Sequence, residues 1–338
     1  MAALKVGING FGRIGRAFFR LAQASPDVEV VAINDLGAVE GLAYLLERDT
    51  AYGKANFTVS SKPGALIAGS KEIKVFAEKD PAAIPWASVG AKVVVESTGV
   101  FDSFEKAKAH LQGGALHVVI SAPAKDADTN TEGATVLMGI NEDKLKTCSV
   151  SANASCTTNA GSPLMAILGY KLGIEHALLN TTHAMTASQS LVDGQSKGNT
   201  REWRAAGHNL IPTSTGAAIA VTKALPQFEK KFDGISIRAP VLVGSIVDVT
   251  FVSKRQTTVE EVNAILSAAA LDDRWKGIFA VTNEQLVSSD IVGRLEGSIA
   301  DLSLTRVVGG TLVKVLAWYD NEMGYANTLL KHVILAGK

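Results

Sequence analysis

The sequence predicts an α/β protein of two domains: a first domain built on a parallel sheet covered by helices, and an α+β second domain with a mixed, largely antiparallel sheet. Short apolar strands alternate with helical patterns in the first half of the chain. Beyond the middle the strands are longer and alternate between apolar and polar residues, and no repeat or flexible linker separates the halves. A chain of 338 residues also fits two domains, because domains usually contain about 100–200 residues.

The first half opens with a β–α–β unit. Lys5–Asn9 is a short apolar strand, Arg16–Gln23 has apolar residues at helical spacing, and Val28–Ile33 is a second, β-branched strand. Mostly apolar strands of this kind are typical of a parallel sheet. The alternation continues in two further strands and the helix between them, Lys92–Val95, His117–Ile120 and Ser103–Leu111.

The second half has a different pattern. A helix is expected at Ser155–Gly169, entered through a turn of small residues, and the chain ends in another helix within residues 320–338. Two long alternating strands and the helix between them are expected at Gly244–Val252, Thr311–Trp318 and Thr258–Ala270. We therefore expect residues 1–155 to form the first domain, with helix 320–338 returning to it, and residues 156–319 to form the second.

The composition excludes several classes of function. Lys plus Arg and Asp plus Glu are equal at 33 each, so the chain lacks the basic excess typical of nucleic-acid and membrane-surface proteins. No apolar run approaches the roughly 18 residues of a membrane helix, and the chain begins almost directly with a strand, so no signal peptide is expected. With only two cysteines, we expect a soluble, cytoplasmic protein without a disulfide scaffold.

A glycine-rich turn lies between the first strand and the first helix. In Gly10-x-Gly12-x-x-Gly15 the first glycine permits a tight turn, the second lets the backbone approach a pyrophosphate, and the third lets the helix pack closely on the strand. Alone, such a turn could bind nothing. Asp35, 20 residues after Gly15 at the end of the second strand, is placed to bind the ribose hydroxyls of NAD and to repel the 2′-phosphate of NADP. Together they predict a Rossmann-type domain that binds NAD.

Cys156 is the candidate nucleophile. It lies among small polar residues at the start of a predicted helix, where free amides and the helix dipole lower a thiol pKa. Cys148 lacks these neighbours and is interpreted as structural. None of the six histidines is spaced as a metal-ligand pair and there is no Cys-x-x-Cys, so no metal site is expected. Spacing alone leaves open which histidine serves Cys156; His183, at a hydroxyl-rich strand end, is one candidate.

Several segments then resemble one family along essentially the whole chain, the glyceraldehyde-3-phosphate dehydrogenases. The most specific is Ser155-Cys156-Thr157-Thr158-Asn159. The others are Val6 to Arg16, Glu96 to Phe101, Ser214 to Ala218 and Trp318 to Glu322.

The resemblance implies a role for each matching residue. Cys156 matches the nucleophile and His183 the base. The positions that match cofactor contacts are Gly10, Gly12, Arg13, Ile14, Gly15, Asp35, Lys79, Ser121 and Asn321. Those that match the site for the substrate's phosphate are Thr186, Ser188 and Arg238. Those that match the site for inorganic phosphate are Ser155, Thr157, Arg201, Thr215 and Gly216, with Arg204 as an alternative to Arg201.

The resemblance also implies a reaction. It is the glycolytic oxidation of D-glyceraldehyde 3-phosphate by NAD and inorganic phosphate to 1,3-bisphosphoglycerate and NADH, through a thioester on Cys156, in a homotetramer that needs no nucleic acid or membrane. Two relatives are alternatives. An erythrose-4-phosphate dehydrogenase would send the thioester to water, and Ser214-Thr215-Gly216 argues against it. An NADP-preferring biosynthetic enzyme is disfavoured by Asp35. A third possibility, a non-catalytic binding protein on this fold, is disfavoured by the neutral charge and by the presence of both Cys156 and His183.

Overall fold

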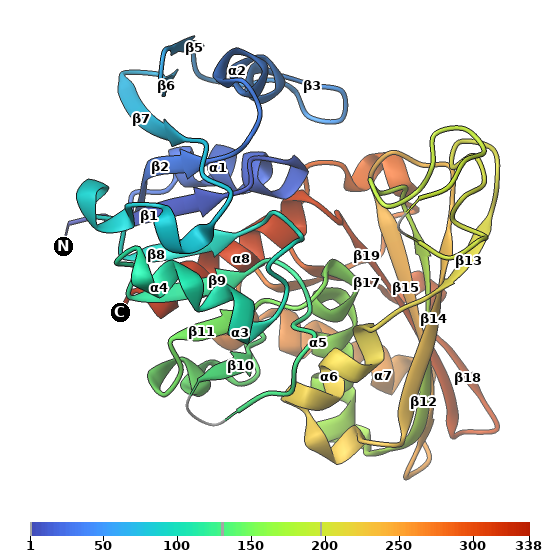
Figure 1. Ribbon diagram of the computed structural model, residues 1–338. Coiled ribbons are helices and arrows are strands. Elements are labelled where there is room, and N and C mark those ends of the chain that lie inside the picture. The colour runs from blue at the N-terminus through green and yellow to red at the C-terminus, as the bar shows by residue number, and fades with distance from the viewer. Residues whose placement is uncertain (1, 130–131, 197) are drawn as a thin grey trace. The chain divides into compact units, whose positions relative to one another are not determined.

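The computed structural model describes residues 2–129, 132–196 and 198–338 (Figure 1). The chain divides into two compact units: residues 1–154 together with 326–338, and residues 155–325. Each unit has its own sheet and its own covering helices.

The first unit contains a sheet with the strand order β10-β11-β9-β8-β1-β2-β7-β6-β5. Neighbouring strands are parallel from β10 to β7, whereas β7, β6 and β5 are antiparallel. The strands are β1 Leu4–Asn9, β2 Val28–Asn34, β5 Val59–Lys62, β6 Ala65–Ala68, β7 Lys71–Phe76, β8 Val93–Glu96, β9 His117–Ile120, β10 Gly133–Thr135 and β11 Val150–Ala152. A separate short pair is formed by β3 Arg48–Asp49 and β4 Gly53–Lys54. The Rossmann-type domain is therefore confirmed.

The central strands are buried because nearly all of their residues are apolar. All four residues of β8 and of β9 are buried, and β8 pairs with β1 in the register Val6 to Val93. Helix α1, Arg13–Ala24, begins directly at the glycine-rich turn, earlier than the sequence predicts. The helices of this unit are α1, α2 Val39–Glu47, α3 Phe104–Ala107 and α4 Ala109–Gln112, and the unit also holds residues 326–336 of α8, Met323–Ala336.

The single helix predicted at Ser103–Leu111 is wrong in one respect. The segment forms α3 and α4, which are interrupted at Lys108. The amide of Leu111 bonds to the carbonyl of Lys108, three residues back, so the helix tightens at this point. The spacing of the apolar residues does not predict this interruption.

A buried chain of polar side chains attaches α8 to the sheet of the first unit. His117 Nε2 and His332 Nε2 each lie 2.8 Å from Ser151 Oγ, and His332 Nδ1 lies 3.1 Å from Asn153 Oδ1. All four side chains are buried. The partners match when both rings are neutral: His117 donates to Ser151, Ser151 donates to His332, and His332 donates to Asn153. Burial lowers the pKa of His117 to about 4 and that of His332 to about 3.

The second unit contains a sheet in the order β13-β14-β12-β15-β19-β17-β16, with β18 beside β19. Its strands are β12 Ile174–His183, β13 Ile211–Ser214, β14 Phe232–Arg238, β15 Ser245–Ser253, β16 Phe279–Thr282, β17 Ser298–Asp301, β18 Arg306–Val308 and β19 Leu312–Tyr319. Among the described residues of this unit, only the pairs β12–β14 and β16–β17 are parallel, and the remaining pairs are antiparallel. The prediction of a mixed, largely antiparallel sheet is confirmed.

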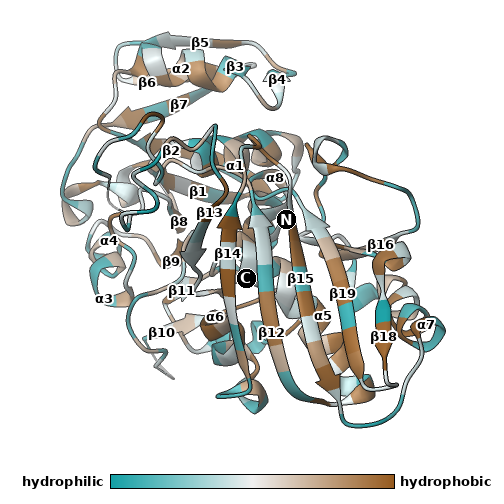
Figure 2. Ribbon diagram, turned by 90° about the vertical axis from the view of Figure 1, so that its right-hand side faces the viewer, coloured by the Kyte–Doolittle hydropathy of each residue, from teal (hydrophilic) through white to brown (hydrophobic). Residues whose placement is uncertain are grey.

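One face of this sheet carries the helices of the unit. These are α5 Cys156–Leu172, α6 Ala217–Ala224 and α7 Val259–Ala270. Figure 2 views the long strands β14, β12, β15 and β19 side by side from the opposite face, with α5 behind them and α7 at the edge beside β18. Leu178, Ile235 and Leu312 are exposed on these strands, at 66%, 55% and 44%. The sheet therefore presents large apolar side chains that its own helices leave uncovered.

Candidate active site

The glycine-rich turn of the first unit has the geometry that its sequence predicts. Gly10 has a φ of 91°, and a Cβ there would lie 2.6 Å from the amide nitrogen of Thr98. A Cβ on Gly15 would lie 2.2 Å from the carbonyl oxygen of Gly10. Gly12, by contrast, has open space on its Cβ side and is exposed. The turn is therefore closely packed at its first and third glycines and open at the second, where a phosphate group would approach.

A pocket of about 380 Å³ adjoins this turn. Asp35 lines it, and its carboxylate accepts hydrogen bonds from the amides of Phe11 at 2.7 Å and Gly37 at 2.8 Å. The other lining residues are Asn9, Gly10, Gly12, Asn34, Leu36, Glu78, Lys79, Ser97, Thr98, Val100 and Phe101. A carboxylate in the lining of a partly apolar pocket suits a ribose with an attached base, so the residues present fit a dinucleotide.

Four other residues predicted to contact the cofactor, Arg13, Ile14, Ser121 and Asn321, do not line this pocket. The guanidinium of Arg13 pairs with Asp49 at 2.5 Å instead of lining the pocket. Ile14 and Ser121 are half-buried and also lie outside the lining of this pocket. Asn321 belongs to the second unit, where its side-chain oxygen accepts hydrogen bonds from Gly244 and Ser245.

In the second unit, Cys156 and His183 face each other. Cys156 is the first residue of α5, and the hydroxyl of Ser155 caps the helix by accepting from the amide of Thr158 at 3.0 Å. Just before it, Ala154 adopts a positive φ of 54°, which turns the chain from β11 into the helix. His183 is the last residue of β12, and its Nε2 lies 3.2 Å from the Cys156 sulfur. This distance permits direct proton transfer between thiol and imidazole.

The other ring nitrogen of His183 has two neighbours. Nδ1 lies 2.7 Å from the carbonyl oxygen of Ala184 and 2.6 Å from a guanidinium nitrogen of Arg238. The parallel register of β12 and β14 aligns His183 with Arg238 and so brings the two side chains together. Because a carbonyl only accepts and a guanidinium only donates, Nδ1 satisfies one of these neighbours at a time.

The electrostatics differ from the sequence expectation at one point. Burial raises the pKa of the Cys156 thiol above its usual value, although Arg238 and hydrogen bonds from Thr157 act in the opposite direction. Burial, reinforced by the charge of Arg238, lowers the pKa of His183 to about 3. The expected lowering of the Cys156 pKa is therefore wrong, because desolvation outweighs the effect of the helix terminus.

Tyr319 is a residue of this site that sequence reasoning missed. Its buried hydroxyl bonds to Thr157 at 2.9 Å and to Thr181 at 2.8 Å, and its ring packs edge-on against His183 with centroids 6.0 Å apart. Burial raises the pKa of Tyr319, so the hydroxyl stays protonated. Tyr319 thus joins the helix that carries Cys156 to the strand that carries His183. The only signal in the sequence was its position in the segment Trp318 to Glu322, which resembles the family.

The residues predicted to hold the substrate's phosphate form two sets. Thr186 and Ser188 lie together just after β12, with their hydroxyl oxygens 3.0 Å apart. Arg238 is half-buried at the end of β14, and its buried Nε has no hydrogen-bond partner among the described residues. A buried guanidinium with an unused donor is suited to an anionic ligand.

The residues predicted to hold inorganic phosphate differ in their exposure and in the hydrogen bonds that they already make. Gly216 is exposed at the start of α6, and the hydroxyl of Thr215 accepts from the amide of Ala217. The hydroxyl of Thr157 is already bonded to Tyr319. Arg201 is exposed, whereas the guanidinium of Arg204 pairs with Asp193 at 2.8 Å.

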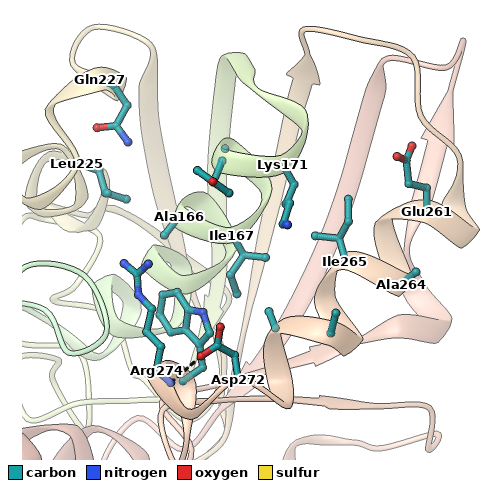
Figure 3. A pocket seen from close by; sticks show the side chains of 15 residues that line it. Ala166, Ile167, Lys171, Leu225, Gln227, Glu261, Ala264, Ile265, Asp272 and Arg274 are labelled. Carbon is teal, nitrogen blue, oxygen red and sulfur yellow. Dashed lines mark hydrogen bonds between the residues drawn. The ribbon is translucent and has the colours of Figure 1, made fainter.

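A larger cavity, of about 870 Å³, lies in the second unit between α5 and α7 (Figure 3). Charged side chains of both signs line it, among them Lys171, Glu261 and Asp272, and the Asp272 carboxylate accepts from the amide of Arg274 at 2.9 Å. Neither Cys156 nor His183 nor any other predicted site residue contributes to its lining. Size alone therefore does not identify the reactive centre.

The described residues contain no group of three or more His, Cys, Asp and Glu side chains placed to hold a metal ion. No helix among them is long and apolar enough to cross a membrane.

Comparison with known proteins gives matches over nearly the whole chain. Residues 4–104 match the family model for the NAD binding domain of glyceraldehyde 3-phosphate dehydrogenase, and residues 155–321 match the model for its C-terminal domain. The chain is 45% identical over 337 residues to glyceraldehyde-3-phosphate dehydrogenase of Streptomyces coelicolor, covering 99% of this chain and 98% of that protein. It is 46% identical over 330 residues to glyceraldehyde-3-phosphate dehydrogenase 1 of Bacillus subtilis, covering 97% and 96%.

Proposed function

The chain belongs to the glyceraldehyde-3-phosphate dehydrogenase family, and from that premise we propose that Cys156 is its nucleophile and His183 its base. The enzyme is an NAD-dependent, phosphorylating dehydrogenase that oxidises glyceraldehyde 3-phosphate in glycolysis. The observation that carries the two assignments is the 3.2 Å contact between the Cys156 sulfur and His183 Nε2.

The proposed chemistry has two stages, acylation of Cys156 and transfer of the acyl group to phosphate. The thiol proton passes to His183 Nε2, and the Cys156 sulfur bonds to the aldehyde carbon as the carbonyl π bond breaks. His183 then returns that proton to the former carbonyl oxygen, which gives a hemithioacetal and leaves Nε2 free to accept again. His183 accepts the hydroxyl proton as the carbon loses a hydride, which leaves an acyl thioester on Cys156. Bound NAD supplies the hydride acceptor. Inorganic phosphate then attacks the thioester, and the sulfur leaves as the acyl phosphate forms.

The base role of His183 sets a requirement on Arg238. Nε2 can accept the thiol proton only when the ring proton is on Nδ1, and Nδ1 then donates to the carbonyl of Ala184. In that form the Arg238 guanidinium must direct its hydrogens elsewhere. The phosphate of the substrate is a suitable acceptor, which supports placing that phosphate at Arg238 with Thr186 and Ser188.

For the attacking phosphate we propose Ser155, Thr157, Thr215, Gly216 and Arg201. The pairing of Arg204 with Asp193 supports Arg201 over Arg204. For the cofactor we propose contacts from Arg13, Ile14, Lys79, Ser121 and Asn321 in addition to the three glycines and Asp35.

We propose a homotetramer in the cytoplasm that needs neither nucleic acid nor a membrane. The uncovered apolar sheet face of the second unit supports association with further copies. Leu191 and Val192, exposed at 85% and 72%, lie in the Gln189–Arg204 segment that is proposed to line the cofactor site of a neighbouring subunit. Equal numbers of acidic and basic residues support the lack of a nucleic-acid role.

We also propose that residues 1–155 with helix 320–338 form the NAD-binding domain and residues 156–319 the catalytic domain. The two compact units, which divide after Ala154 and after Tyr325, support this division, with the second boundary six residues later than proposed.

The assignment is tested by following NADH formation from glyceraldehyde 3-phosphate and from erythrose 4-phosphate, with NAD or NADP, with and without inorganic phosphate. We expect rapid turnover only with glyceraldehyde 3-phosphate, NAD and phosphate together. Turnover that is independent of phosphate would instead support the erythrose-4-phosphate dehydrogenase alternative.

Asp35 is expected to decide between the two nucleotides. Replacing Asp35 with Gly and Leu36 with Thr removes a carboxylate that binds the ribose hydroxyls and repels a 2′-phosphate. We expect the ratio of kcat/KM for NAD to that for NADP to fall by at least about tenfold, since a hydrogen bond to a charged group contributes about 1.5–3 kcal/mol. Leu36→Thr alone is the control. An unchanged ratio in the double variant would remove Asp35 from the selectivity argument.

Arg238 and Arg201 are expected to serve two different phosphates. Arg238→Ala should raise the KM for glyceraldehyde 3-phosphate by at least about tenfold, and Arg201→Ala should raise mainly the KM for inorganic phosphate while leaving the burst of NADH intact. Because Arg238 also contacts His183, its variant should lower kcat as well. Arg204→Ala is the control. If both variants weaken both phosphates alike, the division into two sites is incorrect.

A further inference from the structure

Glu96 is bonded to residues that line the pocket containing Asp35, but is not itself among the lining residues. It ends β8 and is 2% exposed. One carboxylate oxygen accepts from Asn9 Nδ2 at 2.6 Å and lies 3.0 Å from His110 Nε2; the other accepts from the amide of Thr98 at 2.8 Å and from its hydroxyl at 2.5 Å. The proposed chemistry does not use Glu96, so this dense set of contacts calls for another explanation.

The directions of these hydrogen bonds are fixed by their partners. Trp86 Nε1 can only donate, and it lies 3.0 Å from His110 Nδ1, so Nδ1 accepts. A neutral ring then carries its proton on Nε2 and donates to Glu96. Glu96 therefore receives donors on both oxygens, which a carboxylate satisfies and which an amide of the same shape cannot.

The hydrogen bonds continue from Glu96 to the next strands. Asn9, at the end of β1, accepts from Asn34 at 2.8 Å, and Asn34, at the end of β2, exchanges two hydrogen bonds of 2.8 and 2.9 Å with the backbone of Glu78. Glu78 immediately precedes Lys79, and both line the pocket. One buried carboxylate thus connects the ends of β8, β1 and β2 and the segment that follows β7.

Thr98, on the other side of Glu96, connects it to the glycine-rich turn. Its amide is the nearest atom to the Cβ side of Gly10, at 2.6 Å from an ideal Cβ, and Ser97 Oγ donates to the Gly10 carbonyl at 2.7 Å. A shift of Thr98 would therefore move the turn as well as the pocket wall.

We propose that Glu96 is a positioning residue for NAD. Through Thr98 it fixes the glycine-rich turn, and through Asn9 and Asn34 it fixes the lining segment at Glu78 and Lys79, without itself lining the pocket. The inference rests on the NAD-binding part of the proposed function and is independent of the roles given to Cys156 and His183. Residues that line a binding site are held in position by the hydrogen bonds of the residues behind them, and loss of those bonds weakens ligand binding.

The first test is Glu96→Gln, which keeps the shape but places an NH₂ group against at least one donor. We expect the dissociation constant for NAD, measured by calorimetry without substrate, and the KM for NAD to rise about 10- to 100-fold. The kcat at saturating NAD should stay within about threefold of wild type, and Cys156 should be alkylated at the wild-type rate. Glu105→Gln, which changes an exposed glutamate of α3, is the matched control and should alter none of these values.

A second variant tests the direction of the hydrogen bonds. In N9D/E96Q the new aspartate accepts from the glutamine amide and still accepts from Asn34, so the pair is reversed at constant charge. We expect at least fivefold recovery of NAD affinity relative to E96Q, short of wild type because the amide also faces His110. N9D alone, with two carboxylates in contact, should bind NAD as poorly as E96Q. A role in packing alone predicts no such recovery.

These measurements distinguish an incorrect role for Glu96 from an incorrect assignment of NAD as the cofactor. If E96Q binds NAD within threefold of wild type, or if a folded N9D/E96Q binds no better than E96Q, the positioning role of Glu96 is overturned. If E96Q does not fold, recovery of both folding and NAD affinity in N9D/E96Q supports the proposal, and a folded double variant with weak NAD binding overturns it. A wild-type protein that does not bind NAD contradicts the proposed function itself.

Discussion

Replacing Cys156 with serine is expected to reduce turnover by at least about 10⁴-fold while leaving NAD binding unchanged. The sulfur lies 3.2 Å from His183 and is the only group at that position that can form the thioester. A serine hydroxyl ionises far less readily and gives a more stable ester, so both acylation and phosphorolysis should fail. The measurements are kcat with glyceraldehyde 3-phosphate and the dissociation constant for NAD by calorimetry.

The matched control is Cys148→Ala, the other cysteine of the chain. Cys148 is buried, and burial raises its pKa to about 11, so it is inert as a nucleophile. Its variant should retain kcat within a few fold, and iodoacetamide should still inactivate it. Activity above a trace in Cys156→Ser would rule out covalent catalysis at this position.

Replacing His183 with asparagine is expected to slow acylation by roughly 10²–10⁴-fold, the usual contribution of a general base. Asparagine can occupy the space and can still donate, but it cannot take the thiol proton. Burial raises the pKa of the Cys156 thiol, so the thiol depends on His183 to accept its proton. Without that acceptor, Cys156 should react more slowly with iodoacetamide near neutral pH than it does in wild type. Single-turnover NADH formation and alkylation rates are the two measurements.

His176→Asn provides the control on the same strand, because His176 is exposed on β12, whereas His183 is buried. It should leave acylation and alkylation as in wild type. Alkylation kinetics that are the same in His183→Asn and wild type would mean that His183 is not the partner of Cys156.

The parts of the fold that the sequence predicts are those governed by local chemistry. The glycine-rich turn, the β-branched strand at Val28–Asn34 and the helix capped by Ser155 each depend on residues within a few positions of one another. Helix α2 and the antiparallel strands β5 to β7 were not predicted, because each is short and its burial is set by tertiary packing.

The site contains contacts that no local pattern encodes. Arg238 reaches His183 through the parallel pairing of β12 and β14, although the two residues are 55 positions apart. Tyr319 is 162 positions from Thr157. The sequence proposes Cys156 from its helix terminus, but the pKa of its thiol depends on burial, which only the folded chain supplies.

The buried pair His117 and His332 makes the protein's stability depend on proton binding. Both rings have pKa values in the folded chain far below the 6.5 of a free imidazole, at about 4 and about 3. Between pH 6.5 and those values the unfolded chain binds more protons than the folded chain, so unfolding takes up protons and stability falls as the pH falls. Protonating either ring also breaks the match of donors and acceptors through Ser151 that attaches the C-terminal helix to the sheet. Acid therefore weakens the attachment of the C-terminal helix to the sheet of the first unit, through Ser151 and Asn153, which shortly precede Cys156 in the sequence.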